Sequence, residues 1–133
     1  MFVDTSAIVA ILSRETDADD LSAKLEAAQT RLTSPLVRLE ACMVLATKLR
    51  MDPADVEPEL DEFFLETGIS VVPIDDETGR LAVAAFRRYG KGRGSPARLN
   101  LADCLSYACA RQHNVPILFK GRDVSHTDIP AAS

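Results

Sequence analysis

The sequence predicts an α/β domain with a central, mostly parallel β-sheet and helices on both faces, which is a three-layer α/β/α arrangement. Short apolar or β-branched runs alternate with longer segments in which apolar residues recur at helical spacing. Such alternation is typical of βαβ units, in which right-handed helical crossovers join parallel strands. The chain has 133 residues, of which 47% are hydrophobic, and no repeat or linker divides it. We therefore expect a single domain over residues 1–133.

Four short segments are expected to form the strands of this sheet. The third of them, ISVVP, is rich in β-branched residues, and the fourth, VPILF, is a continuous apolar run. The expected strands are residues 2–3, 31–33, 69–73 and 115–119.

The segments between the expected strands have the caps and the apolar spacing of helices. Ser34 and Pro35 form a helix start, because serine is a preferred N-cap and proline fits the first helical position. Asp75 and Asn100 can cap two later helices in the same way. The expected helices are residues 7–13, 17–28, 35–50, 53–66, 75–89 and 100–113.

Composition argues against several classes of protein. No apolar run approaches the roughly 18 residues of a membrane span, and the N-terminus lacks the basic flank and cleavage site of a signal peptide. The three cysteines, Cys42, Cys104 and Cys109, form no C-x-x-C pair, and only two histidines are present, so a zinc site is not expected. We expect buried, reduced cysteines in a cytoplasmic protein that does not contact a membrane.

Charge is distributed unevenly along the chain. The net charge of −5 argues against a protein that holds nucleic acid by bulk charge alone. Residues 52–67 hold seven acids and no base, which is typical of the solvated face of a helix. Residues 87–98 hold five bases and no acid, and GKGRGSPAR within them is rich in glycine. This loop suits phosphate contacts through Lys91, Arg93 and Arg98, or it is a solubilising surface loop.

Four acidic residues occupy positions that suit a functional site. Asp4 and Asp123 follow the first and last expected strands, and the carboxyl ends of strands are where open α/β sheets bind ligands. Glu40 and Asp103 interrupt apolar segments of two helices, where a carboxylate is costly to bury without a partner. Together they fit a site for a hard cation, which prefers several carboxylate oxygens with water completing the shell.

Each of these acids also has a local explanation. Asp4 could cap the helix that follows it, and Asp103 could complete a capping box three residues after Asn100. Glu40 could pair with Arg38 or with a distant base, and Asp123 could lie in a turn. The spacing alone leaves these alternatives open.

Four ordered segments carry the acids. VDTSAIVAIL contains Asp4, SPLVRLEACMVL contains Glu40, SPARLNLADCLSYACA contains Asp103, and VPILFKGRDVSHTDI contains Asp123. In content and order these segments resemble the PIN-domain ribonucleases, in particular the VapC toxins of bacterial toxin–antitoxin pairs, in which the matching acids bind metal. The resemblance covers nearly the whole chain, and the third segment is its most specific part.

The resemblance implies a metal-dependent endoribonuclease toxin of a type II toxin–antitoxin system, with an acidic quartet that holds Mg²⁺ or Mn²⁺. Asp4 and Asp103 are the expected direct ligands, whereas Glu40 and Asp123 ligate through water or Glu40 orients the nucleophile. In-line attack by water would leave a 5′-phosphate and a 3′-hydroxyl. Asp128 competes with Asp123 for the fourth position, and we favour Asp123.

The resemblance also implies supporting residues and partners. Thr5 and Ser6 offer hydroxyls beside the first acid, and Lys91, Arg93 and Arg98 are the expected RNA-binding residues. The expected partners are RNA, a VapB-type antitoxin whose C-terminal segment wraps the domain, and a second copy of the chain in a homodimer.

Two other interpretations were compared with the ribonuclease. A catalytically silent PIN-like interaction module is the alternative, although the presence of all four acids favours the enzyme. A HAD-type phosphatase would need a second aspartate two residues after the first, and position 6 is Ser6. The sequence departs from many relatives at Ser95, Ala102 and Val124, where those relatives have histidine, glycine and an aromatic residue.

Overall fold

The computed structural model describes residues 1–121 and 126–132, and its centre is a parallel β-sheet. The strands follow the order β3-β2-β1-β4, so the first strand of the chain lies in the interior of the sheet. Phe2 of β1 pairs with Leu32 of β2 on one side and Ile117 of β4 on the other. The strands are β1 (Phe2–Val3), β2 (Leu32–Thr33), β3 (Ser70–Val71) and β4 (Ile117–Leu118). The predicted parallel sheet is confirmed, with strands shorter than expected after the first.

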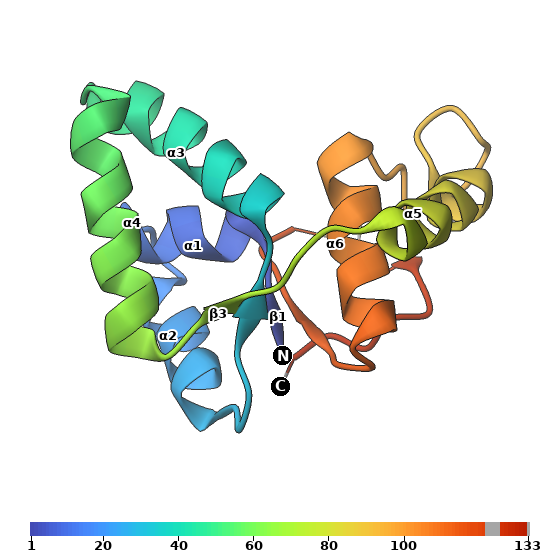
Figure 1. Ribbon diagram of the computed structural model, residues 1–133, viewed down its shortest axis with the longest axis horizontal. Helices are drawn as coiled ribbons and strands as arrows, with labels where there is room; N and C mark the ends of the chain where they lie inside the picture. The colour runs from blue at the N-terminus through green and yellow to red at the C-terminus, as the bar shows by residue number, and fades with distance from the viewer. Residues whose placement is uncertain (122–125, 133) are drawn as a thin grey trace.

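Helices cover both faces of the sheet, which confirms the three-layer prediction. Figure 1 shows α1 to α4 on one side of the strands and α5 and α6 on the other. The helices α3 and α6 also contact each other across the boundary between the two groups. The helices are α1 (Thr5–Leu12), α2 (Ala18–Ala27), α3 (Pro35–Leu49), α4 (Pro53–Thr67), α5 (Asp76–Tyr89) and α6 (Leu101–Gln112).

Side-chain caps start the helices where the sequence indicates. The Ser34 hydroxyl accepts a hydrogen bond from the Val37 amide, and Pro35 occupies the first turn of α3. The helix α1 starts two residues earlier than expected, because Asp4 directly after β1 acts as its N-cap. The first loop of the chain is therefore a single residue, which brings the aspartate to the carboxyl end of the central strand.

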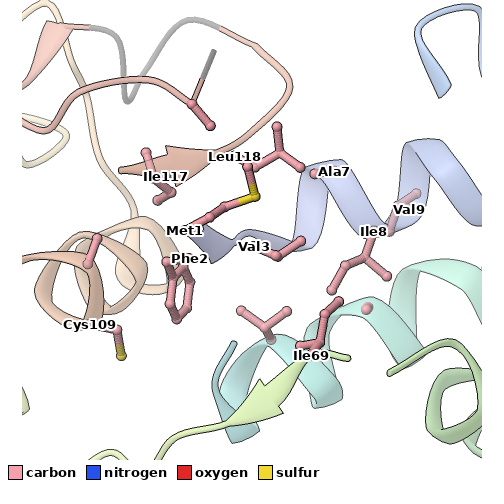
Figure 2. Close-up of a cluster of buried hydrophobic side chains, with 14 of the residues drawn as sticks. Met1, Phe2, Val3, Ala7, Ile8, Val9, Ile69, Cys109, Ile117 and Leu118 are labelled. Carbon is pink, nitrogen blue, oxygen red and sulfur yellow. The ribbon is translucent and has the colours of Figure 1, made fainter. Parts of the chain in front are cut away.

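The core surrounds the two interior strands. Phe2, Val3, Ile117 and Leu118 are buried and belong to one hydrophobic cluster with Ile8 of α1 (Figure 2). Burial of each large apolar side chain contributes about 1.5–3 kcal/mol relative to exposure. All three cysteines are buried and free of disulfides, as expected. In the described part of the chain no helix has the length and apolarity needed to cross a membrane.

The two ends of the described chain meet beside the sheet. The Ile117 amide donates to the Pro130 carbonyl at 3.1 Å, and the Ala132 amide donates to the Ile117 carbonyl at 3.0 Å. The chain termini consequently lie close together (Figure 1). This return of the C-terminal residues covers the outer edge of β4, which would otherwise expose unpaired backbone groups.

Candidate active site

The carboxyl ends of β1 and β4 and the start of α6 open onto a cleft of about 470 Å³. Three of the four predicted acids, Asp4, Glu40 and Asp103, line this cleft although they come from three separate elements. A hollow of similar size, about 490 Å³, lies between α5 and α6, but no carboxylate lines it. The residues lining the acidic cleft are Asp4, Thr5, Ser6, Val9, Glu15, Glu40, Val44, Asp103, Lys120 and Gly121.

Asp4 is 6% exposed, and its carboxylate is held from two directions. Its Oδ2 accepts hydrogen bonds from the Ser6 amide at 3.2 Å and the Ser6 hydroxyl at 2.9 Å. Its Oδ1 accepts a hydrogen bond from the Ser106 hydroxyl of α6 at 2.8 Å. Asp4 is therefore the N-cap of α1 and also a lining residue of the cleft, so its capping role leaves the site prediction open.

Asp103 has the same double position. Its amide donates to Asn100 Oδ1 at 2.9 Å, and its Oδ2 accepts from the Asn100 amide at 3.1 Å, which forms the expected capping box of α6. The capping box orients the side chain in the first turn, where the partial positive charge of the helix N-terminus favours a carboxylate. The first turn of α6 thus presents Asp103 at the cleft.

Glu40 lies in the second turn of α3 and is partly exposed. The sequence left open a pair between Glu40 and Arg38, but Arg38 forms its ion pair with Asp61 of α4. Arg38 also lies over the ring of Phe64, 5.1 Å from its centroid. Glu40 therefore lines the cleft, and among the described residues no ion pair joins it to Arg38.

The fourth predicted acid, Asp123, lies outside the described residues. Its competitor Asp128 is described, and it does not line the cleft. The Asp128 carboxylate accepts a hydrogen bond from the Tyr107 hydroxyl and forms ion pairs with Arg88 and Arg111. These contacts lower the pKa of Asp128, with the hydrogen bond from Tyr107 as the largest cause. Asp128 therefore serves a structural cluster away from the other acids.

Sequence reasoning missed three polar residues at or beside the cleft. Ser106 could have been found, because it follows Asp103 by three positions on the same helix face. Glu15 and Lys120 had no local signal. Their side chains form an ion pair at 3.2 Å, and Lys48 joins Glu15 at 3.0 Å. Hydrogen bonds from the two lysines lower the pKa of Glu15, and Glu15 raises the pKa of Lys120.

The donor set of the cleft suits a hard divalent cation. Asp4, Glu40 and Asp103 all line it, and hard divalent cations prefer oxygen ligands such as their carboxylates. The Thr5 hydroxyl oxygen is buried at the same place and has no hydrogen-bond partner among the described residues. Within residues 1–121 and 126–132 no three acid, histidine or cysteine side chains are grouped closely enough to hold a metal ion. A cation held by these carboxylates would therefore need water or further donors to complete its coordination.

The basic loop between α5 and α6 is closed at its base and projects its cations outward. The Leu99 amide donates to the Tyr89 carbonyl at 2.8 Å, and the Lys91 amide donates to the Leu99 carbonyl at 2.9 Å. Lys91, Arg93 and Arg98 are all exposed. The Arg93 guanidinium lies 5.8 Å from the centroid of the Phe86 ring. The loop does not line the acidic cleft, but it leads directly into the capping box that positions Asp103.

Comparisons with known proteins agree with this arrangement. A family model described as PIN domain matches residues 1–130. Ribonuclease VapC42 of Mycobacterium tuberculosis is 42% identical over 132 residues, which cover 99% of this chain and 98% of that protein.

Two solved structures have the same fold. The M. tuberculosis toxin VapC20, described as cleaving the sarcin–ricin loop, superposes with a TM-score of 0.72 at 16% identity over 99% of this chain and 98% of that one. A toxin–antitoxin complex from Klebsiella pneumoniae gives a TM-score of 0.67 at 19% identity over 93% of this chain and 89% of that one.

Proposed function

The chain belongs to the PIN-domain family of VapC ribonucleases, and from this premise we propose that its acidic cleft hydrolyses RNA phosphodiester bonds. Its function is that of an endoribonuclease toxin of a bacterial toxin–antitoxin system. The observation that supports the cleft as the site of cleavage is that Asp4, Glu40 and Asp103 come from three elements to line one cleft. A ribonuclease relative matches over nearly its whole length, which supports assigning the activity to this domain.

The enzyme depends on a divalent cation, which we propose is Mg²⁺ or Mn²⁺. When bound, it makes the attacking water more acidic and stabilises negative charge on the phosphate and the leaving oxygen. Asp4 and Asp103 would hold it directly, and Asp123 would be the fourth acid. Two such cations, +4 in all, would change the formal charge of −5 to −1, which reduces repulsion of a polyanionic substrate.

Two other residues of the cleft position the reacting groups. Glu40 orients a water molecule in line with the scissile phosphate, and Ser6 keeps the Asp4 carboxylate fixed through two hydrogen bonds. Water attacks phosphorus, and the bond to the 3′ oxygen breaks. The products are a 5′-phosphate and a 3′-hydroxyl.

Lys91, Arg93 and Arg98 are proposed to contact the RNA backbone. They are exposed on one glycine-containing loop, which ends where the helix of Asp103 begins. Positive side chains at this place would hold a strand whose phosphates continue into the acidic cleft.

The proposed partners are a VapB-type antitoxin and a second copy of the chain. An active ribonuclease must be masked in the cytoplasm where RNA is present, and an acidic cleft suits a cationic group of an inhibitor. Large apolar side chains exposed on α3 support such contacts, because monomeric surfaces rarely leave several of them together. They are Leu39, Met43, Val44 and Leu49.

The decisive test of the metal site is the variant Asp103→Asn. An asparagine oxygen can still accept the hydrogen bond from the Asn100 amide, so the helix cap is retained while the charge is removed. We expect RNA cleavage to fall by orders of magnitude, and the rise in Tm on adding millimolar Mn²⁺ to shrink, because ligand stabilisation grows with the logarithm of concentration over Kd. Melts in chelator and in Mn²⁺ measure this directly.

Asp75→Asn is the matched control. Asp75 also belongs to a capping box, as the N-cap of α5 where Asp103 is the third residue of α6, and it does not line the cleft. The Asp75→Asn variant should show the same decrease in Tm in chelator and in Mn²⁺, and its RNA cleavage should equal that of the parent. If Asp103→Asn behaves in the same way as this control, Asp103 is a cap and the metal site proposed here is wrong.

A co-expression experiment tests the antitoxin. The chain is purified after expression with the product of its neighbouring gene, and RNA cleavage is measured before and after the complex is separated by denaturation and refolding. We expect a stable, inactive complex that becomes active on separation. Recovery of free, fully active chain from the co-expression would contradict the proposed partner.

A further inference from the structure

Ser106 lies on α6, the helix that carries Asp103, and its side chain contacts Asp4. Its hydroxyl donates a 2.8 Å hydrogen bond to Asp4 Oδ1, across 102 positions of the sequence. Both side chains are buried, with exposed fractions of 2% for Ser106 and 6% for Asp4. Because a hydrogen bond to a charged partner is stronger when water is excluded, this contact restrains the carboxylate more than an exposed contact would.

The direction of this hydrogen bond is unusual for a serine within a helix. Such serines usually face solvent or bond back to the carbonyl four residues earlier. The hydroxyl of Thr47, a threonine inside α3, does the latter with the Met43 carbonyl at 3.1 Å. Ser106 instead points its proton at a carboxylate of another element, so its hydroxyl has a role beyond the local structure of α6.

The helix places Ser106 and Asp103 on one face, because they are three residues apart. The single helix α6 therefore supplies one acid to the cleft and holds another. The second oxygen of Asp4 is held by Ser6, whose hydroxyl also accepts a hydrogen bond from the Lys120 amide at 2.8 Å. Asp4 is thus fixed between α6 on one side and the segment after β4 on the other.

We propose that Ser106 is a positioning residue that sets the orientation of Asp4 relative to Asp103 and thereby the affinity of the cleft for a divalent cation. This inference rests on the proposed function of the cleft. Hydrogen-bond partners of metal ligands typically contribute about 10- to 100-fold to metal affinity or activity. The Ser106 hydroxyl meets the description of such a partner, since it is buried and directed at the oxygen of an expected ligand.

The test is the affinity of the full chain for Mn²⁺ by isothermal titration, measured on the parent and on Ser106→Ala. We expect Kd for Mn²⁺ to rise about 10- to 100-fold. RNA cleavage by the variant should need correspondingly more Mn²⁺ and return to within a few-fold of the parent rate at saturation. A purely structural role for Ser106 would lower Tm in chelator without moving Kd.

Thr67→Val is the matched control, because it also removes one side-chain hydroxyl hydrogen bond, the one to the Phe63 carbonyl in α4. It should leave Kd for Mn²⁺ unchanged. Ser106→Cys, which has similar size but is a weak donor, repeats the measurement if the alanine variant does not fold. A Kd within twofold of the parent for the folded Ser106 variant overturns the inference.

Asp4→Asn separates this inference from the proposed function. If Asp4→Asn abolishes Mn²⁺ binding while Ser106→Ala leaves it unchanged, the cleft binds metal and only the role of Ser106 is wrong. If Asp4→Asn also leaves Mn²⁺ binding unchanged, the proposed metal site itself is wrong.

Discussion

The hydroxyl of Tyr107 donates a hydrogen bond to the carboxylate of Asp128, and this pair joins the C-terminal segment to α6. The same carboxylate lies 3.4 Å from Arg88 of α5 and 3.7 Å from Arg111 of α6. The residues that follow Asp128 then return to the edge of β4 through Ala132. The cluster therefore holds the end of the chain against the face of the molecule opposite α1 to α4.

Tyr107→Phe should lower the free energy of unfolding at pH 7 by about 1–2 kcal/mol. A hydrogen bond to a charged group contributes about 1.5–3 kcal/mol, and the value here is reduced because the Asp128 side chain is partly exposed. Urea unfolding measures the change. Tyr89→Phe is the matched control, since it removes a hydroxyl from the adjacent ring, for which the described residues offer no hydrogen-bond partner. Equal effects of the two variants would contradict the assigned role of the hydrogen bond.

The contribution of Asp128 should depend on pH in a defined direction. Its pKa is lowered from 3.8 in the folded chain, by the hydrogen bond from Tyr107 first and by the two arginines after it. A lowered pKa stabilises the fold above the unfolded value of about 3.9, and this stabilisation is lost as pH falls through the folded pKa. The difference in free energy of unfolding between the parent and Asp128→Asn should therefore be constant from pH 7 to about pH 5 and shrink below pH 4. Urea unfolding across this pH range measures the difference. A difference that persists at pH 2 would show that the negative charge of Asp128 is not the source of the stabilisation.

Two glycines, Gly79 within α5 and Gly90 directly after it, should respond to alanine in opposite ways. A Cβ at Gly79 meets nothing within 4 Å, so Gly79→Ala should raise the free energy of unfolding by about 0.5–1 kcal/mol through helix propensity. A Cβ at Gly90 would lie 2.3 Å from Phe86 Cδ1 and 2.5 Å from the Phe86 carbonyl oxygen. The Phe86 carbonyl cannot move without breaking the hydrogen bond that it accepts from the Gly90 amide. Gly90→Ala should therefore lower the free energy of unfolding by about 1–3 kcal/mol. Thermal unfolding of both variants tests the pair, and the same sign for both would be the contrary result.

The basic loop should determine how RNA binding depends on salt. Lys91 and Arg93 are exposed there and are replaced together by alanine. The slope of log affinity against log salt should flatten by about 0.7 for each lost contact to a single-stranded phosphate. Filter binding of RNA from 50 to about 300 mM salt measures the slope. Arg80→Ala, which removes an exposed arginine at the other end of α5, is the control. If the double variant keeps the parent slope, the loop only solubilises the surface.

Local sequence determined most of the secondary structure and the acids of the cleft. The starts at Ser34, Asp75 and Asn100 follow from side-chain hydrogen bonds that span three residues, so a short window contains both partners. The alternation of strands and helices along the chain was sufficient to predict a parallel sheet with helices on both faces. The positions of Asp4 and Asp103, at the end of a strand and in the first turn of a helix, place both at the carboxyl edge of any such sheet.

Tertiary structure decided which atoms meet at that edge. The hydrogen bond between Ser106 and Asp4 joins residues 102 positions apart, and the ion pair of Lys120 with Glu15 joins the segment after β4 to the end of α1. The sequence offers Asp128 as a candidate for the fourth acid, yet its carboxylate accepts a hydrogen bond from Tyr107 of α6. No local pattern encodes these pairings, because they depend on how far each helix is rotated about its axis when its apolar face packs on the sheet. The sequence thus specified the acids and the elements that carry them, whereas packing of α6 against β1 specified the partner that holds each one.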